Sequence, residues 1–225
     1  MINFLRILRN NYKKRYGRLP VYLRKARGVI HVGANDGRER AYYDRARLDV
    51  LWVEALPDVF AALQANLQDY SRQRALNYLL VEADGRKISF NVASNNAESS
   101  SIFELADHVE IWPEVGFVGK IELTGYTFAT MVSREAIDLS RYDTLILDVQ
   151  GAELLVLKGA ERHLAGFRYI LAEAADFNCY AGATTLAELE AHLAARGYRL
   201  IKTYEFASKE GVGRYCDALF TRMDS

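Results

Sequence analysis

The chain has 225 residues, and its 29 Lys and Arg balance 29 Asp and Glu, so the formal net charge is zero. Nine of the basic residues and no acidic ones lie in residues 1–35, which leaves 20 basic and 29 acidic residues in the remainder. Because this acidic remainder repels phosphate, the charge argues against a nucleic-acid-binding protein, and contents of 50% hydrophobic and 12% aromatic residues argue against a disordered chain.

The length is typical of one domain of roughly 100–200 residues, although two small domains are an alternative. No uninterrupted apolar stretch approaches the ~18–20 residues that a membrane-spanning helix needs. The N-terminal segment has arginines within its apolar part and no small-residue cleavage site, which is not typical of a secretory signal. The two cysteines, Cys179 and Cys216, lack zinc-site spacing and favour a reduced, cytoplasmic protein, with a single disulfide as the less usual alternative.

Short apolar runs and helical patterns alternate along the chain. Runs that are apolar at consecutive positions predict strands buried on both faces, as in a parallel sheet. They lie at residues 29–32, 50–53, 144–149 and 169–172. Apolar stripes of helical period lie at residues 58–67, 151–164 and 185–196. This alternation predicts an α/β fold, with right-handed strand–helix–strand units in a Rossmann-like, mostly parallel, doubly wound sheet.

The last part of the chain has a different pattern. Residues 198–204 and 215–221 are two strand candidates joined by a segment with glycines at 211 and 213, and we expect them to pair antiparallel at one edge of the sheet. Residues 86–93 alternate and predict a strand or half of a hairpin. The long stretch 94–120 has no sustained period, which is typical of a functional or mobile loop.

A glycine-rich turn, Gly33-Ala34-Asn35-Asp36-Gly37, follows the first apolar run. Glycine allows a tight turn and a close approach of a ligand to the backbone, and a helix N-terminus after the turn favours a carboxylate or phosphate. The spacing is G-x-x-x-G, which is weak evidence for a dinucleotide site. An ordinary strand–helix turn is the alternative interpretation.

Acidic residues end three of the predicted strands, at Glu54, Asp148 and Glu173. Glu54 lies some 20 residues beyond the glycine turn, where an acid can accept hydrogen bonds from both hydroxyls of a ribose, although a helix-capping role is the alternative. Asp148 emerges from a hydrophobic run, and a carboxylate in such a place needs a partner. Glu153 lies in the first turn of the next helix, where it can act as a capping residue.

Together these three motifs resemble the FkbM family of S-adenosylmethionine-dependent methyltransferases, over about residues 28–220. The family pattern D-V-G-A-N-x-G, E-P-x-P and I-D-V-E-G-A-E with V-L-x-G-A corresponds here to HVGANDG at 31–37, VEALP at 53–57 and LDVQGAELLVLKGA at 147–160. The resemblance implies a Rossmann-like methyltransferase fold, S-adenosylmethionine (AdoMet) as methyl donor, and O-methylation of a sugar, a glycan or a glycosylated small molecule. The chain departs from the pattern at His31, Ala55 and Gln150, which stand where the family has Asp, Pro and Glu.

The same resemblance implies roles for individual residues. The positions that match the pattern and would line the AdoMet site are Gly33, Asn35, Gly37 and Glu54. Asp148 would face the methyl acceptor, and Asn77 or Tyr78, near the end of the third strand, would flank the adenine.

Two hypotheses compete for removal of the acceptor proton, which a poorly nucleophilic sugar hydroxyl requires. In one, a histidine is the base, and His108 is the candidate because it lies in the 94–120 loop beside a serine cluster. In the other, Asp148 and Glu173 hold a divalent cation such as Mg²⁺, with Asp176 and Asn178 as further oxygen ligands. The Ser- and Asn-rich segment 94–104 is interpreted either as a lid over a polar acceptor or as a solvated surface loop.

Two other classes of function remain as alternatives. An NAD-dependent oxidoreductase is disfavoured by the glycine spacing and by the lack of a Tyr-x-x-x-Lys pair, since Ile146 stands four residues after Tyr142. A non-catalytic Rossmann-like module is disfavoured because Gly33, Gly37, Glu54 and Asp148 are all present.

The basic residues 1–27 are interpreted as an N-terminal extension to a methyltransferase domain at 28–225. Leucines and tyrosines at three- or four-residue spacing between residues 5 and 19 predict an amphipathic helix. This helix either packs on the acidic domain or across the AdoMet site, or it contacts an anionic membrane through residues 1–20. The second interpretation suits a lipid-linked glycan and a peripheral position at the inner face of a membrane.

Overall fold

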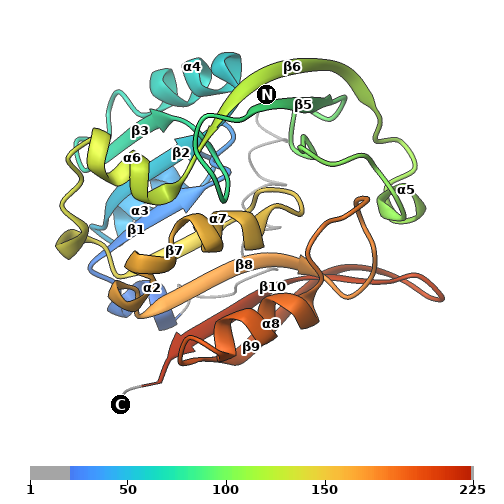
Figure 1. Ribbon diagram of the computed structural model, residues 1–225. Coiled ribbons are helices and arrows are strands. Elements are labelled where there is room, and N and C mark those ends of the chain that lie inside the picture. The colour runs from blue at the N-terminus through green and yellow to red at the C-terminus, as the bar shows by residue number, and fades with distance from the viewer. Residues whose placement is uncertain (1–20, 224–225) are drawn as a thin grey trace.

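The computed structural model describes residues 21–223 and is built on a seven-stranded sheet of order β3-β2-β1-β7-β8-β10-β9 (Figure 1). The five parallel strands are β1 (Gly28–Val32), β2 (Asp49–Glu54), β3 (Gln73–Asn77), β7 (Thr144–Leu147) and β8 (Tyr169–Ala175). The antiparallel edge consists of β10 (Gly213–Arg222) and β9 (Tyr198–Lys209). The predicted Rossmann-like α/β class and its antiparallel C-terminal edge are therefore confirmed.

Helices cover both faces of this sheet because the strands are apolar on both sides. One face packs against α2 (Val21–Lys25), α3 (Arg40–Arg45) and α4 (Pro57–Asn66). The other packs against α6 (Phe128–Arg134), α7 (Glu153–Gly159) and α8 (Leu186–Ala194), of which α7 and α8 lie in front of the sheet in Figure 1. Every residue of β1 and β7 is buried, as the continuous apolar runs predicted.

Two of the three predicted helices differ from expectation at their ends. The helix predicted at 58–67 begins one residue earlier, at Pro57, with Leu56 as N-cap and Asp58 in its first turn. Proline suits the first helical position because its missing N–H has no intrahelical partner there. By contrast, α8 begins at its predicted place, where Thr185 and Glu188 form a capping box.

The helix predicted at 151–164 is divided into α7 and a 3₁₀ helix at Glu161–Gly166. The last residue of α7, Gly159, packs directly on the backbone just after Leu80, since a Cβ on Gly159 would overlap the carbonyl oxygen of Val81. The apolar period predicts a helix here, but it does not predict the residue at which the helix ends against another part of the chain.

A second sheet of three strands stands beside the first. Here β5 (Lys87–Ala93) pairs antiparallel with β6 (Phe117–Tyr126), and β4 (Leu79–Leu80) pairs parallel with β6. The segment between β5 and β6 contains the short helix α5 (His108–Ile111). The strand predicted at 86–93 is thus one half of a hairpin with a long connection.

Of the predicted N-terminal extension 1–27, the structure describes only the residues from 21 on, where α2 packs through the buried Leu23. The amphipathic helix predicted between residues 5 and 19 lies outside the described residues, and its membrane contact stays a prediction. Within residues 21–223, no helix has the length and apolar character needed to cross a membrane. Both cysteines, Cys179 and Cys216, are buried free thiols.

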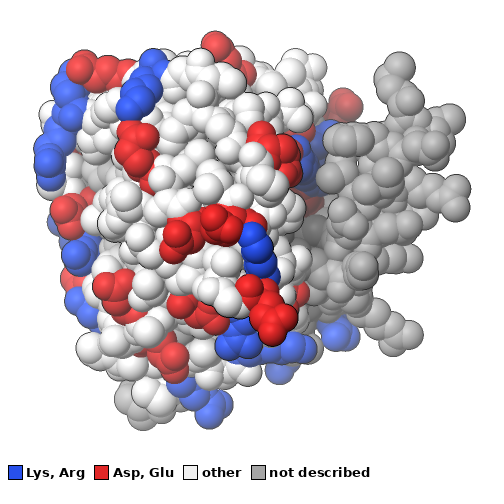
Figure 2. All heavy atoms as spheres, turned by 90° about the vertical axis from the view of Figure 1, so that its right-hand side faces the viewer, with Lys and Arg blue, Asp and Glu red and all other residues white. Residues whose placement is uncertain are grey.

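The carboxyl ends of β1, β2, β7 and β8 lie toward the right-hand side of the molecule in Figure 1. Figure 2 views the molecule from that side, and a band of acidic side chains crosses the middle of the face. All three sequence motifs follow strands that end at this edge, so parallel pairing brings them together.

Candidate active site

Gly33 brings the first motif against the third. It follows β1 with φ = +83°, a backbone conformation that favours glycine, and its N–H donates to the Val53 carbonyl at 3.0 Å. A Cβ at this position would overlap the carbonyl oxygen of Asp148. The turn after β1 and the turn after β7 are thus in contact, and only glycine allows this approach.

The carboxylate of Glu54 is buried at the end of β2 and holds two backbone N–H groups. Its Oε2 accepts from Asn35 N at 2.8 Å, and its Oε1 accepts from Leu56 N at 2.9 Å. Burial raises the pKa of Glu54, while hydrogen bonds from Leu56 and Asn35 act in the opposite direction. Each carboxylate oxygen has more than one lone pair, so Glu54 can also accept from a diol. This donor and acceptor pattern fits the ribose of AdoMet.

The two candidates for adenine contact have different surroundings. The Asn77 amide donates to the carbonyls of Glu54 at 2.8 Å and Ala55 at 3.0 Å, which stabilises the chain directly after Glu54. The Tyr78 hydroxyl instead donates to Glu135 beyond α6, at 2.9 Å. Asn77 is therefore the one whose side chain bonds to the Glu54 segment.

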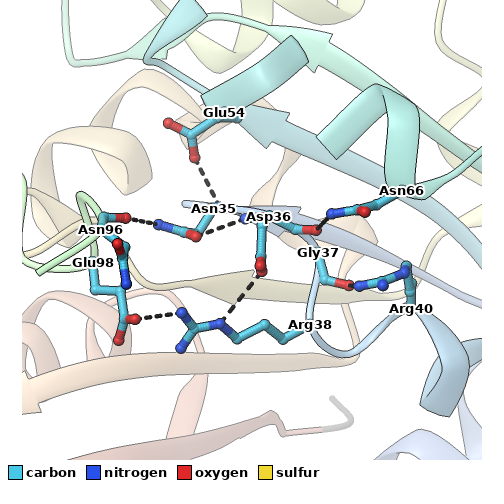
Figure 3. Close-up of polar contacts among 9 residues, drawn as sticks. All are labelled: Asn35, Asp36, Gly37, Arg38, Arg40, Glu54, Asn66, Asn96 and Glu98. Carbon is cyan, nitrogen blue, oxygen red and sulfur yellow. Dashed lines mark hydrogen bonds and ion pairs between the residues drawn. The ribbon is translucent and has the colours of Figure 1, made fainter. Parts of the chain in front are cut away.

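The loop after β5 is bonded to the glycine turn (Figure 3). Asn35 Nδ2 donates to the Asn96 carbonyl at 3.3 Å, and the Arg38 guanidinium pairs with the Glu98 carboxylate. Arg38 also lies 3.4 Å from Asp36, so two acids of different segments share one cation. These contacts hold residues 96–98 against the glycine turn.

The three serines of this loop are buried, and their hydrogen bonds lie within the protein. Ser100 Oγ accepts from Ala93 N at 3.0 Å, and Ser101 Oγ donates to the Gln150 carbonyl at 2.7 Å. Ser99 accepts at its carbonyl from the Tyr180 hydroxyl at 3.3 Å. A solvated surface loop does not describe these serines, because the segment is bonded to the turns after both β1 and β7.

A glutamine joins the two acids that were predicted to share a cation. Gln150 Nε2 donates to Asp148 Oδ1 at 2.7 Å and to Glu173 Oε1 at 3.1 Å. Glu173 was expected at the end of its strand, but β8 continues to Ala175. Asp148 and Glu173 are still neighbours, since Leu147 and Ala172 pair across β7 and β8.

A third acid for a metal site does not join this pair in the described part of the chain. No group of three or more His, Cys, Asp or Glu side chains within residues 21–223 is arranged to hold a metal ion. Asp176 is bonded to Arg214, whose backbone N–H and Nε donate to it at 2.8 and 3.0 Å. The predicted Mg²⁺ site at Asp148 and Glu173 therefore stays a prediction.

Two further acids near Asp148 have raised pKa values. Burial raises the pKa of Glu153 to about 7, and its Oε1 accepts from Val149 N at 3.0 Å and Gly151 N at 3.3 Å. Burial also raises the pKa of Glu39 to about 7, and the charge of Asp148 adds to this shift. Glu153 caps the turn that carries Asp148, whereas no pattern in the sequence distinguished Glu39.

His108 lies within the 94–120 segment, where it begins α5 and is buried. Its Nδ1 lies 2.7 Å from the Tyr215 hydroxyl, and its ring lies 5.0 Å from that of Tyr180 between centroids. Its Nε2 is buried and has no hydrogen-bond partner among the described residues. Burial lowers the pKa of His108 to about 4, so the ring is neutral at pH 7.

Residues 31–200, which contain all of these motifs, match the family model of the methyltransferase FkbM domain. The chain belongs to this family. The 2-O-methyltransferase NoeI of Sinorhizobium fredii (strain NBRC 101917 / NGR234) is 26% identical over 162 residues, which cover 68% of this chain and 65% of NoeI. Fibrillarin of Aeropyrum pernix, solved with natively bound S-adenosyl-L-methionine, has a TM-score of 0.53 at 12% identity, over 93% of this chain and 74% of that one, and shows a shared fold.

Membership of the FkbM family confirms the resemblance and argues against the oxidoreductase and binding-module alternatives. The structure brings together Gly33, Asn35 and Glu54 on one side of the site and Asp148 with Glu173 on the other. Sequence reasoning missed Tyr180, and it recorded Gln150 only as a departure from the family pattern. That departure was the available signal. A neutral residue in place of a glutamate, two positions after Asp148, changes what the Asp148 carboxylate can bind.

The buried neutral state of His108 predicts a pH dependence of stability. Since the folded-state pKa is lowered to about 4, the stabilisation is fully present above the unfolded-state pKa of about 6.5 and is lost as the pH falls from there toward 4. We expect the free energy of unfolding of the wild type, relative to His108→Gln, to fall by about 2 kcal/mol between pH 7 and pH 4. Urea denaturation at both pH values measures this difference, and equal pH dependence of the two proteins would contradict it.

Proposed function

We propose that this FkbM-family protein transfers a methyl group from S-adenosylmethionine to a hydroxyl group of a sugar, a glycan or a glycosylated small molecule. The observation that carries the proposal is the contact of the Glu54-anchored glycine turn with the Asp148 turn at Gly33. Through this contact, the Glu54 carboxylate, which we assign to the ribose diol, and Asp148 lie at one edge of the sheet. The name of NoeI, a 2-O-methyltransferase, supports oxygen as the methylated atom.

Three groups of this chain would hold AdoMet. Glu54 accepts from the ribose hydroxyls, the turn from Gly33 to Gly37 gives a close backbone approach, and Asn77 stabilises the chain behind Glu54. S-adenosylmethionine supplies an electrophilic methyl group on a sulfonium centre. The protein's task is then to orient the acceptor oxygen in line and to remove its proton.

Asp148 is the group that we assign to the acceptor proton. It follows β7 at the same edge as Glu54, and Gln150 Nε2 donates to its Oδ1, which keeps that oxygen an acceptor. The competing base, His108, has one ring nitrogen on Tyr215 and the other buried. A base must reach the acceptor hydroxyl within hydrogen-bond distance, so this geometry favours Asp148.

The test is methyl transfer from isotopically labelled AdoMet to a panel of sugars and glycolipid head groups, followed by mass spectrometry. We expect Asp148→Asn to lower kcat about 100-fold or more while the Kd for S-adenosylhomocysteine stays within about twofold, because a general base acts on the chemical step. Asp138→Asn, which changes an exposed acid beyond α6, is the matched control. Full activity of Asp148→Asn would contradict its role, and methylation only of nitrogen or carbon acceptors would contradict the proposed substrate class.

A further inference from the structure

Gln150 is the centre of a polar cluster that the proposed reaction has not yet used. Its two amide hydrogens reach Asp148 Oδ1 and Glu173 Oε1, and its Oε1 accepts from the Tyr180 hydroxyl at 2.8 Å. The opposite orientation of the amide would direct an oxygen at two carboxylates and a hydrogen at a hydroxyl. Donor and acceptor chemistry therefore supports the orientation in the structure.

The backbone of Gln150 is held as firmly as its side chain. Its φ is +53°, which is uncommon for a residue with a side chain, and its carbonyl accepts from the buried Ser101 Oγ at 2.7 Å. Gly151 follows with φ = +97°, and a Cβ there would clash with Ala183 at 2.6 Å. Strained conformations of this kind persist only where the surroundings hold them, and they cluster at functional sites.

Charge explains why an amide suits this position. Two carboxylates that lie close together repel each other, and a hydrogen-bond donor between them offsets this repulsion. Gln150 supplies one N–H to each carboxylate, so both oxygens that it contacts remain acceptors. Glutamate at the same place would put three carboxylates together without a donor.

We propose that Gln150 is a positioning residue that holds Asp148 and Glu173 side by side and orients Asp148 for removal of the acceptor proton. The inference rests on the proposed function, since it assigns Gln150 a task in the same reaction. Gln150 also links the serine-containing segment 99–101 to Asp148. Ser101 donates to the backbone carbonyl of Gln150, and Tyr180 donates to its side-chain oxygen.

The first test converts the amide into a third acid and uses Mn²⁺ alone as the probe. We expect Gln150→Glu to bind Mn²⁺ at least about tenfold more tightly than the wild type in electron paramagnetic resonance titrations, because carboxylate oxygens suit this ion. Adding Asp148→Asn to that variant should remove the gain. Gln64→Glu, an added acid on the exposed side of α4, should not produce it. Equal Mn²⁺ affinity of Gln150→Glu and the wild type would overturn the inferred convergence of the three side chains.

The second test separates positioning from a merely structural role. We expect Gln150→Leu to lower kcat about tenfold or more with unchanged Kd for S-adenosylhomocysteine, and Gln150→Glu to recover activity with added Mn²⁺ but not in EDTA. Unchanged kcat in Gln150→Leu would overturn the positioning role.

A third measurement needs no acceptor. The side-chain amide signals of Gln150 in a ¹⁵N–¹H spectrum should shift in both Asp148→Asn and Glu173→Gln, since each carboxylate contacts the amide. Signals that respond to neither change would overturn the bridge. If the wild type methylates no acceptor, the proposed function fails, whereas the Mn²⁺ and amide measurements still decide whether Gln150 joins the two acids.

Discussion

Glu54→Ala is expected to bind S-adenosylhomocysteine about 100-fold or more weakly than the wild type. A hydrogen bond to a charged group contributes about 1.5–3 kcal/mol, and tenfold in affinity corresponds to about 1.4 kcal/mol, so two ribose hydroxyls account for a loss of this size. The variant also loses the acceptor for Asn35 N and Leu56 N, so the glycine turn is held less firmly. Isothermal titration calorimetry measures the change directly.

The controls separate a lost contact from a lost fold. Glu122→Ala removes an exposed acid of β6, whose pairing with Lys87 is at the surface, and it should leave the affinity unchanged. Glu54→Gln keeps the shape but turns one oxygen into a donor, so we expect an intermediate affinity. A Glu54→Ala protein that melts cooperatively and binds S-adenosylhomocysteine within threefold of the wild type would contradict the ribose role.

The environment of Glu54 adds a pH dependence to this binding. Since burial raises the pKa of Glu54, its carboxylate is protonated at a higher pH than an ordinary glutamate. Protonated Glu54 loses acceptor capacity, so affinity for S-adenosylhomocysteine should decline as the pH falls through that raised pKa. The same decline should be absent from Glu54→Gln, which does not titrate.

Gly33→Ala is expected to lower the free energy of unfolding by about 3–4 kcal/mol, from two costs that add. The first is the positive φ of +83°, which disfavours any residue with a Cβ. The second is the overlap of that Cβ with the Asp148 carbonyl, a backbone atom that cannot rotate away. Relief requires the turns after β1 and β7 to move apart, so the variant should also bind S-adenosylhomocysteine more weakly.

Alanine substitutions at two other glycines separate these two costs when the free energy of unfolding is measured by urea denaturation. Gly85 has φ = +80° and no atom within 4 Å of an added Cβ, so Gly85→Ala should show the conformational cost alone, about 1 kcal/mol. Gly119 in β6 has neither feature, and alanine there should change stability by less than about 0.5 kcal/mol. A loss in Gly33→Ala no larger than that in Gly85→Ala would show that the two turns are not tightly packed.

Much of the candidate site was predictable because its members lie at strand ends. Glu54 and Asp148 each follow a run of consecutive apolar residues, and parallel pairing of such runs puts their carboxyl ends at one edge. The buried position of His108 was not predictable in this way, because its Nδ1 contacts Tyr215, 107 residues away in the chain. Local composition near His108 does not reveal a partner on the last strand.

The sequence by itself determined the class of fold, the antiparallel C-terminal edge and the order of the three motifs, because apolar period, capping residues and glycine turns act over a few neighbouring residues. Only the tertiary structure decided how Gln150 joins Asp148 to Glu173 and that Glu173 lies within its strand. It also decided how the segment 94–104 bonds to the turns after β1 and β7. These features depend on burial and on partners from distant segments. The distances and angles of hydrogen bonds between residues far apart in the sequence depend on how the strands assemble, so a local sequence pattern does not predict them.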